Sequence, residues 1–259
     1  VLAMGGRIWT DALREVRKTL SRFFSLFLLS ALSVAFLAGL RATAPDMELS
    51  ADAYFDQQGL MDLRVLSTLG LTQEDVTQLA AQPGIDGAEG SYTVDAMVKG
   101  RDSDVIVKVH ALSAQGFNTP TLVEGRMPQH AGECLVEPAL LTTAGLSLGD
   151  TITLDTGTGD YADALAQDTF TVVGTAQSPL YISVERGSSS LGTGKVAAFV
   201  LLPMEAFSMD SYTEVYLRAE GLQGLPCYGE EYEDRIDALT QQLDPLAVER
   251  AQLRYDQVV

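Results

Sequence analysis

The sequence lacks the residue arrangements of common catalytic and metal sites. Its two histidines, His110 and His130, lie far apart with no HExxH motif. The glycine-rich residues 187–195 do not form a phosphate loop, because Ser189 and Val196 replace its first glycine and its final Ser/Thr. We therefore predict no enzyme, no catalytic, metal or cofactor site, ordinary surface roles for both histidines and a surface loop at 187–195.

Acidic side chains are frequent but do not form a recognisable cation site. Residues 155–160 (DTGTGD) have too few oxygen ligands at the spacing of a calcium loop. The paired acids at 230–231 and 233–234 precede a helical pattern, where negative charge suits the positive end of a helix. Both groups therefore indicate structural rather than catalytic roles.

Cysteine is scarce, with only Cys134 and Cys227 in the chain. Outside the cell a disulfide between them is permitted, and two cysteines allow just one pairing. Nothing in their spacing demands contact, since Cys134 lies in an apolar strand and Cys227 in a turn before a helix. We expect two free thiols, at least one of them buried, and the bridge stays open as an alternative.

Positive charge is also scarce, with 17 basic against 35 acidic residues and a net charge of −18. Residues 1–22 carry a net +3 and Arg41 adds one more, which leaves −22 on residues 42–259. So acidic a region will not bind nucleic acid or anionic lipid through its overall charge. Its acidity mainly favours solubility.

Only one long uncharged apolar run is present, the 18 residues 23–40. As a helix it spans about 27 Å, close to the hydrocarbon thickness of a bilayer. Basic residues gather before it, at 14, 17, 18 and 22, whereas Arg41 alone flanks its other end. We predict a transmembrane helix with the N-terminus cytoplasmic and residues after about 41 extracytoplasmic, because Lys and Arg remain inside.

A secretory signal peptide is the rival interpretation, since Ala42-Thr43-Ala44 resembles a cleavage site. The apolar run is longer than usual for a signal, Arg41 precedes the site, and Pro45 would follow the cut. These features favour the membrane helix. Its small residues Ala31, Ala35 and Gly39 share one face that another helix can approach closely, although chance in an Ala-rich span also explains them.

Residues 8–20 place apolar side chains at helical spacing opposite Arg14, Arg17 and Lys18, and Trp9 suits a membrane interface. This pattern predicts an amphipathic helix on the cytoplasmic surface. A helix that simply continues into the span is the alternative.

The remaining residues mix helical and strand patterns. Residues 46–57 are expected to be helical, with Pro45 as a joint or first turn. Alternation predicts strands at 61–65 and 92–98, and between them Thr72 and Asp75 can cap a helix that Pro83-Gly84 ends. Residues 61–98 thus form one expected β-α-β unit.

A β-rich stretch follows, and then a second β-α-β signal. Short strands are predicted at 105–109, 133–136, 151–154, 169–174 and 196–202. The second unit consists of a strand at 213–217, a helix over 232–243 and a returning strand at 248–253. We predict an α+β fold in which two similar units flank a β-rich insertion.

Several segments, in this order and spacing, resemble the MacB/FtsX-like ABC transporter permeases, especially those of Gram-positive bacteria. They are residues 11–47, 60–76 (LMDLRVLSTLGLTQEDV), 123–138 (VEGRMPQHAGECLVEP), 145–154 (GLSLGDTITL) and 194–207 (GKVAAFVLLPMEAF). The resemblance implies an amphipathic and a transmembrane helix in residues 1–44 and a two-lobed, MacB-like extracytoplasmic domain in 45–259. A porter-like α/β lobe would take 45–100 and 205–259, and a β-rich lobe would be inserted at 101–204.

The resemblance also implies partners: a cytoplasmic ABC ATPase, and other permease helices or a second permease copy. The chain departs from a whole permease because no second apolar run of membrane length follows Leu40. We therefore interpret it as a fragment that couples ATP hydrolysis to export or to mechanical work outside the cell. The alternative is an FtsX-like scaffold that binds or regulates an extracellular cell-wall hydrolase, which an apolar groove between the lobes would favour. An extracellular protein or peptide is a further expected partner.

Overall fold

The computed structural model describes residues 14, 18, 20–101, 103–157, 161–183 and 185–258. The chain divides into two compact units, Val1–Ala51 and Asp52–Val259. Each unit is described by itself. Most of the amphipathic helix predicted at 8–20 lies outside the described residues.

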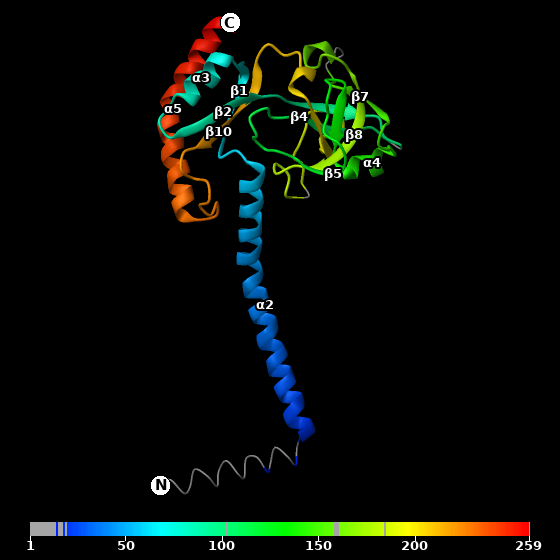
Figure 1. Ribbon diagram of the computed structural model, residues 1–259, viewed down its shortest axis with the longest axis vertical. Coiled ribbons are helices and arrows are strands. Elements are labelled where there is room, and N and C mark those ends of the chain that lie inside the picture. Colours follow the sequence, from blue (N-terminus) through cyan, green and yellow to red (C-terminus); the bar gives the residue numbers. More distant parts are fainter. Residues whose placement is uncertain are drawn as a thin grey trace. The chain divides into compact units, whose positions relative to one another are not determined.

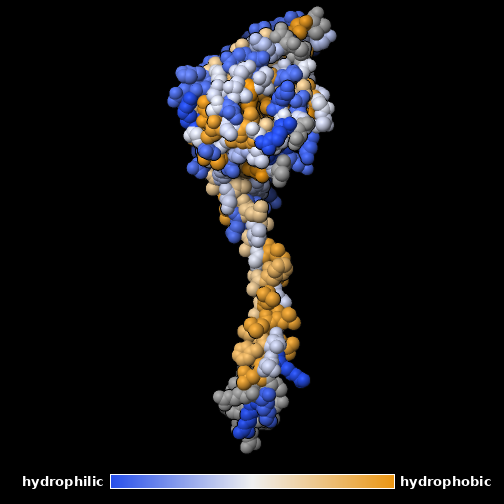
Figure 2. Space-filling model, turned by 90° about the vertical axis from the view of Figure 1, so that its right-hand side faces the viewer, coloured by the Kyte–Doolittle hydropathy of each residue, from blue (hydrophilic) through white to orange (hydrophobic). Residues whose placement is uncertain are grey.

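Helix α2, Leu20–Gln58, contains the predicted membrane span in its first part. None of its residues is fully buried, and an 18-residue window reaches a mean hydropathy of 2.3, so α2 has the length and composition to cross a membrane. Figure 2 shows hydrophobic side chains along this part of the helix. The Ser25 and Ser33 hydroxyls each donate to the carbonyl four residues earlier at 2.8 Å, so these polar groups are satisfied within the helix.

Pro45 lies inside α2 and does not end it. Proline removes one helical hydrogen bond, and its ring presses against the preceding turn. The expectation of a helix over 46–57 is confirmed, and Pro45 lacks the N–H that would donate a helical hydrogen bond within it.

In the second unit, three antiparallel strands form sheet A, in the order β1 (Leu63–Leu71), β10 (Tyr212–Ala219) and β2 (Ile85–Ser91). Helices α3 (Gln73–Ala80) and α5 (Glu230–Val258) pack against this sheet (Figure 1). The shared core includes Leu79 of α3 and Leu239 and Leu243 of α5. The acids expected at a helix start, Glu230, Glu231 and Glu233, do occupy the first turn of α5.

Helix α3 begins with the predicted capping box. The Thr72 hydroxyl accepts the Asp75 N–H at 3.3 Å, and the Asp75 carboxylate accepts the Thr72 N–H at 2.7 Å. Two otherwise unpaired donors are thereby satisfied. Arg250 of α5 also binds Asp75, so the cap ties the two helices together.

Thr72→Ala should lower the free energy of unfolding by about 0.5–2 kcal/mol, the usual cost of losing an N-cap. Thermal unfolding of the full chain measures it. Thr77→Ala is the matched control, because the Thr77 hydroxyl only donates to a carbonyl within the exposed face of α3. Equal losses for the two variants would contradict a capping role.

Sheet B has seven strands in the order β5 (Thr121–Gly125), β8 (Thr169–Gln177), β6 (Glu133–Val136), β9 (Ala198–Leu202), β4 (Val105–Ala111), β3 (Thr93–Val98) and β7 (Thr151–Asp155). Strand β7 also pairs with β8, so six of the strands close into a barrel and β5 extends it. The barrel encloses the larger core, which includes Val107, Phe170 and Val200. Helix α4 (Pro138–Ala144) and the short 3-10 turns Tyr161–Asp163 and Met204–Ala206 complete this part.

The predicted α+β class is confirmed, and two element assignments were wrong. The strand expected at 92–98 to complete the first β-α-β unit is β3, which pairs with β4 and β7 in sheet B, whereas β2 takes its place in sheet A. Residues 248–253 are helical and belong to α5 rather than to a returning strand. Here Arg250 and Arg254 reach back to Asp75 and to the Leu69 carbonyl, contacts that fix the helix against the sheet A region.

Candidate functional site

The candidate site is the junction at which the last turn of α2 passes into β1. Helix α2 ends with two turn-forming bonds, Gly59 N–H to the Asp56 carbonyl and Leu60 N–H to the Phe55 carbonyl. Gly59 has a φ of +59°, and a Cβ there would lie 2.4 Å from the Gly116 carbonyl oxygen. Only glycine combines this backbone conformation with so close an approach.

The Gly116 carbonyl belongs to a loop that we call the clasp, residues 113–119, which links β4 to β5. Asn118 N–H donates to the Gly59 carbonyl at 2.9 Å, and Thr119 N–H donates to the Gln58 carbonyl at 2.8 Å. The Asn118 side-chain oxygen accepts Met61 N–H at 3.1 Å. The clasp therefore holds the exit of α2 through hydrogen bonds on both sides of Gly59.

Asn118 adopts the left-handed conformation, with a φ of +48°, and is the single non-glycine residue with positive φ in the described part of the chain. Asparagine tolerates this conformation better than most residues. The residue is also buried. A strained, buried position of this kind persists only when its surroundings determine it. Here they are the two hydrogen bonds of Asn118 to the α2 exit and the adjacent one of Thr119.

Sheet A holds the other side of the clasp. The buried Glu89 carboxylate of β2 accepts the Ala114 N–H at 2.9 Å and also accepts the Ser113 hydroxyl. Phe117 of the clasp is buried, and the Arg218 guanidinium of β10 lies 4.5 Å from its ring centre. A loop of the sheet B region is thus bonded to the helix exit and to two strands of sheet A.

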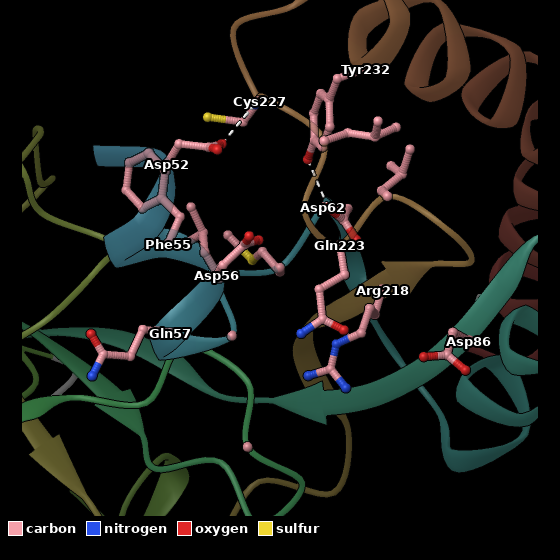
Figure 3. Close-up of a pocket in the computed structure, with 16 residues that line it drawn as sticks. Asp52, Phe55, Asp56, Gln57, Asp62, Asp86, Arg218, Gln223, Cys227 and Tyr232 are labelled. Atoms are coloured by element: carbon pink, nitrogen blue, oxygen red, sulfur yellow. Dashed lines mark hydrogen bonds between the residues drawn. The ribbon is translucent and has the colours of Figure 1, made fainter. Parts of the chain in front are cut away.

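A cavity of about 310 Å³ lies beside the junction (Figure 3). At its edge Asp52 of α2 accepts the Cys227 N–H at 2.8 Å, and Tyr232 of α5 donates to Asp62 at 2.7 Å. The other Asp62 oxygen accepts Ala219 N–H at 2.8 Å. These contacts tie the last turns of α2 and the start of β1 to the segment that begins α5.

A second polar cluster joins the two sheets. His110 of β4 bonds to the Thr93 hydroxyl at 2.8 Å and to the Tyr181 hydroxyl at 2.6 Å. The buried Glu214 carboxylate of β10 accepts the hydroxyls of Thr93 and of Tyr216. The predicted surface role of His110 was wrong, because the pairing of β3 with β4 and the contact with Tyr181 enclose the ring, whereas His130 is exposed as expected.

Acidification from pH 7 towards pH 4 should destabilise the folded unit Asp52–Val259 through His110. Burial chiefly, with Lys108 and Arg64 adding to it and Asp95 opposing, lowers the pKa of His110 from 6.5 to about 3. Between these values the unfolded imidazole binds a proton that the folded one does not, so stability present above pH 6.5 is lost as the pH falls. The loss is on the order of a few kcal/mol.

Thermal unfolding of the full chain between pH 4 and 7 measures this dependence. His110→Gln keeps a hydrogen-bonding side chain but removes the titration, and should flatten the profile. An equally steep profile in wild type and variant would assign the acid sensitivity to other groups.

Both cysteines are free thiols, as expected, so the alternative of a bridge is not realised. Cys134 is buried in the barrel core, and burial raises the pKa of its thiol to about 12. Burial, followed by the hydrogen bond and charge of Asp52, raises the pKa of Cys227 to about 12 as well. Neither thiol is activated as a nucleophile.

The remaining sequence features do not join the site. Loop 187–195 closes on itself, since the Ser189 N–H donates to the Gly194 carbonyl and the Gly194 N–H to the Leu191 carbonyl. These two N–H groups are therefore engaged within the loop and do not point at a phosphate. Of residues 155–160, the last three lie outside the described residues, and Asp155 accepts the Gly157 N–H. Across the described ranges no cluster of three or more His, Cys, Asp or Glu side chains suits a metal.

Comparison with protein families identifies the class. Residues 24–223 match the family model of the MacB-like periplasmic core domain, so the chain belongs to this family. The resemblance to MacB-like ABC permeases noted in the sequence is confirmed. The chain is accordingly a component of a MacB/FtsX-like permease, and its apolar helix followed by a periplasmic-type domain indicates a membrane protein with an extracytoplasmic part.

Solved structures of similar proteins include the extracellular domain of the noncanonical ABC-type transporter YknZ from Gram-positive bacteria, at 12% identity and a TM-score of 0.39, covering 68% of this chain and 87% of that one. The periplasmic region of MacB from Actinobacillus actinomycetemcomitans matches at 12% identity and a TM-score of 0.38, covering 71% and 76%. A domain of a permease protein from Porphyromonas gingivalis matches at 16% identity and a TM-score of 0.30, covering 63% of this chain and 65% of that one. No curated protein sequence matches the chain.

Proposed function

We propose that this ectodomain is moved by α2 when a cytoplasmic ABC ATPase closes, and that the clasp transmits the movement. The observation that supports this most strongly is the bonding of Asn118 and Thr119 to the carbonyls of Gly59 and Gln58. A displacement of the helix exit would pull on β1 through the chain and on sheet B through the clasp. Both sheets would then move in response to the same displacement of α2.

The charge pattern supports the orientation that this mechanism needs. Basic residues precede the apolar run and only Arg41 follows it, so the N-terminus would be cytoplasmic and residues after about 41 extracytoplasmic. Helix-to-ATPase contact would then lie on the cytoplasmic side. The other partners we infer are further permease helices or a second permease copy, and an extracellular protein or peptide.

The FtsX-like scaffold that regulates a cell-wall hydrolase is the second candidate. It needs an apolar groove between the sheets for a partner helix. The cleft found there mixes apolar side chains with charged ones such as Arg64, Lys108 and Glu185. This lining favours a coupling ectodomain over a helix-binding scaffold.

Purification of the full-length protein from its native membrane, with mass spectrometry of the proteins that accompany it, tests the proposal. A stoichiometric cytoplasmic ATPase is the expected result. An external protein alongside it would show whether the work is export or hydrolase regulation. Absence of an ATPase under conditions that preserve other membrane complexes would overturn the permease mechanism.

A further inference from the structure

A cleft of about 730 Å³ lies between the two sheets, and most of the residues that line it take no part in the proposed coupling. Sheet A contributes Arg64 and Leu66 of β1, and sheet B contributes Lys108 of β4. The segment after β8 adds Leu180 and Tyr181. Its volume is in the range of small-molecule sites in proteins.

Two cations on opposite sides of this inter-sheet cleft retain free hydrogen-bond donors. The side chain of Arg64 is 48% exposed, and its nearest acidic atom, on Glu214, is 3.7 Å away. Lys108 donates to Asp95 at 2.6 Å, which leaves two of its three N–H donors. By contrast, Arg186 is held by Glu137 and by the Ser183 carbonyl. Arg64 and Lys108 are therefore the groups that can receive an anion.

The cleft also contains two carboxylates, Glu214 and Glu185, which could compete with a bound anion for the Arg64 guanidinium. Glu214 lies on the floor, where the hydroxyls of Thr93 and Tyr216 donate to it. Glu185 is exposed and lies on the segment after β8. Glu214 forms an ion pair with the Arg64 guanidinium at 3.7 Å, which is longer than a charge-assisted hydrogen bond, so the Arg64 N–H donors remain open to a closer partner.

Apolar side chains line the same cleft. Leu66 is 62% exposed although it is large and lies on a strand, and Leu60, Met61 and Leu180 also face the space. An exposed leucine beside a half-exposed arginine on one face of β1 offers an apolar surface next to a cation. Such a combination fits a molecule with an apolar body and an anionic head.

We propose that the inter-sheet cleft binds a small amphipathic organic anion, with its carboxylate between Arg64 and Lys108 and its apolar body against Leu66 and Leu180. The two cations belong to different sheets, so the bound molecule bridges sheet A and sheet B. Binding would then resist any change in the separation of the sheets. The four side chains that would hold the molecule, those of Arg64, Leu66, Lys108 and Leu180, lie outside the clasp and the α2 exit.

Isothermal titration of the full chain in lipid nanodiscs with decanoate tests the site, with empty nanodiscs as the reference for partition into lipid. We expect saturable binding to the chain. The doubly substituted variant Arg64→Gln/Lys108→Gln should bind decanoate at least roughly tenfold more weakly than the wild type does. The wild type should bind decanol and decyltrimethylammonium more weakly than decanoate by a similar factor. Arg126→Gln is the matched control, because Arg126 is an exposed arginine paired with Glu133 and does not line the cleft.

Three results would overturn the proposal: no binding above that of empty nanodiscs, equal affinity for decanoate and decanol, or full affinity in the double variant. Circular dichroism checks that the variants fold, which is expected because the Arg64 and Lys108 side chains are 48% and 24% exposed. Leu66→Ser provides a second variant, expected to weaken binding of decanoate through its apolar body alone. We expect the ATPase to co-purify unchanged with all these variants. A loss of decanoate binding can therefore be told apart from a failure of the proposed permease role.

Discussion

A seven-residue Gly-Ser insertion after Ala44 should abolish transport or external work by the assembled permease while its ATPase continues to hydrolyse ATP. The account requires α2 to carry movement from the membrane to Gln58 along a helical backbone. Flexible residues cannot carry it, because a Gly-Ser segment behaves as a random coil. Pro45 already removes one helical hydrogen bond next to the insertion point, so fewer hydrogen bonds hold the helix together there.

The matched control is an insertion of equal length with a helix-forming sequence rich in alanine, glutamate and lysine. Seven residues complete about two helical turns and nearly preserve the facing of the residues that follow. Transport should survive this insertion at least in part. Unchanged transport in the Gly-Ser variant would contradict transmission along α2.

Gly59→Ala should destabilise the junction by roughly 2 kcal/mol or more, as two costs combine. One cost is the left-handed backbone, with its φ of +59°. The other is the added Cβ, which would lie 2.4 Å from the Gly116 carbonyl oxygen and force the clasp away from the helix exit. Thermal unfolding of the full chain measures the loss.

Gly149→Ala separates these two costs. Gly149 also has a positive φ, of +92°, but a Cβ there meets no atom within 4 Å. It should therefore carry the conformational cost alone and lose clearly less stability than Gly59→Ala. Equal losses would mean that the close approach of the clasp to Gly59 is unimportant.

The local sequence pattern is sufficient to predict most of the individual helices and strands. The alternation of residues 105–109 and the Thr72/Asp75 box act within a few residues, and both appear as predicted in β4 and α3. The assignment of strands to sheets depends on distant partners and is not visible in local pattern. Strand β3 alternates as expected but follows β2 with a single intervening residue, and its partner is β4.

Long-range packing also decides the helix at 248–253. The short segment from Val248 to Leu253 was expected to be a returning strand. Arg250 and Arg254, four residues apart and thus on one helix face, instead reach Asp75 of α3 and the Leu69 carbonyl of β1. Strand β5 was missed because all of its residues are exposed and give no burial pattern. Helix α4 is short and begins at Pro138, a weak signal by itself.

The contact between the clasp and the α2 exit was not predicted, although one residue on each side of it carries a local signal. Asn118 precedes Thr119 and Pro120, a turn-forming context, and asparagine is tolerant of the left-handed conformation. Gly59 ends a helical pattern, where glycine is common. That these two positions meet follows from the return of the chain after β4, which no periodicity in the sequence indicates.

Hydrogen–deuterium exchange of the peptide that covers the clasp, in the complete permease with its ATPase, tests the central claim most directly. The amides of Ala114, Phe117, Asn118 and Thr119 all donate hydrogen bonds. The account predicts slow exchange in this loop, both at rest and with the ATPase trapped in its closed state, because the clasp must stay bonded to the α2 exit while it moves. Exchange as fast as in the loop 187–195, or a release of protection on ATPase closure, would show that movement does not pass through the clasp.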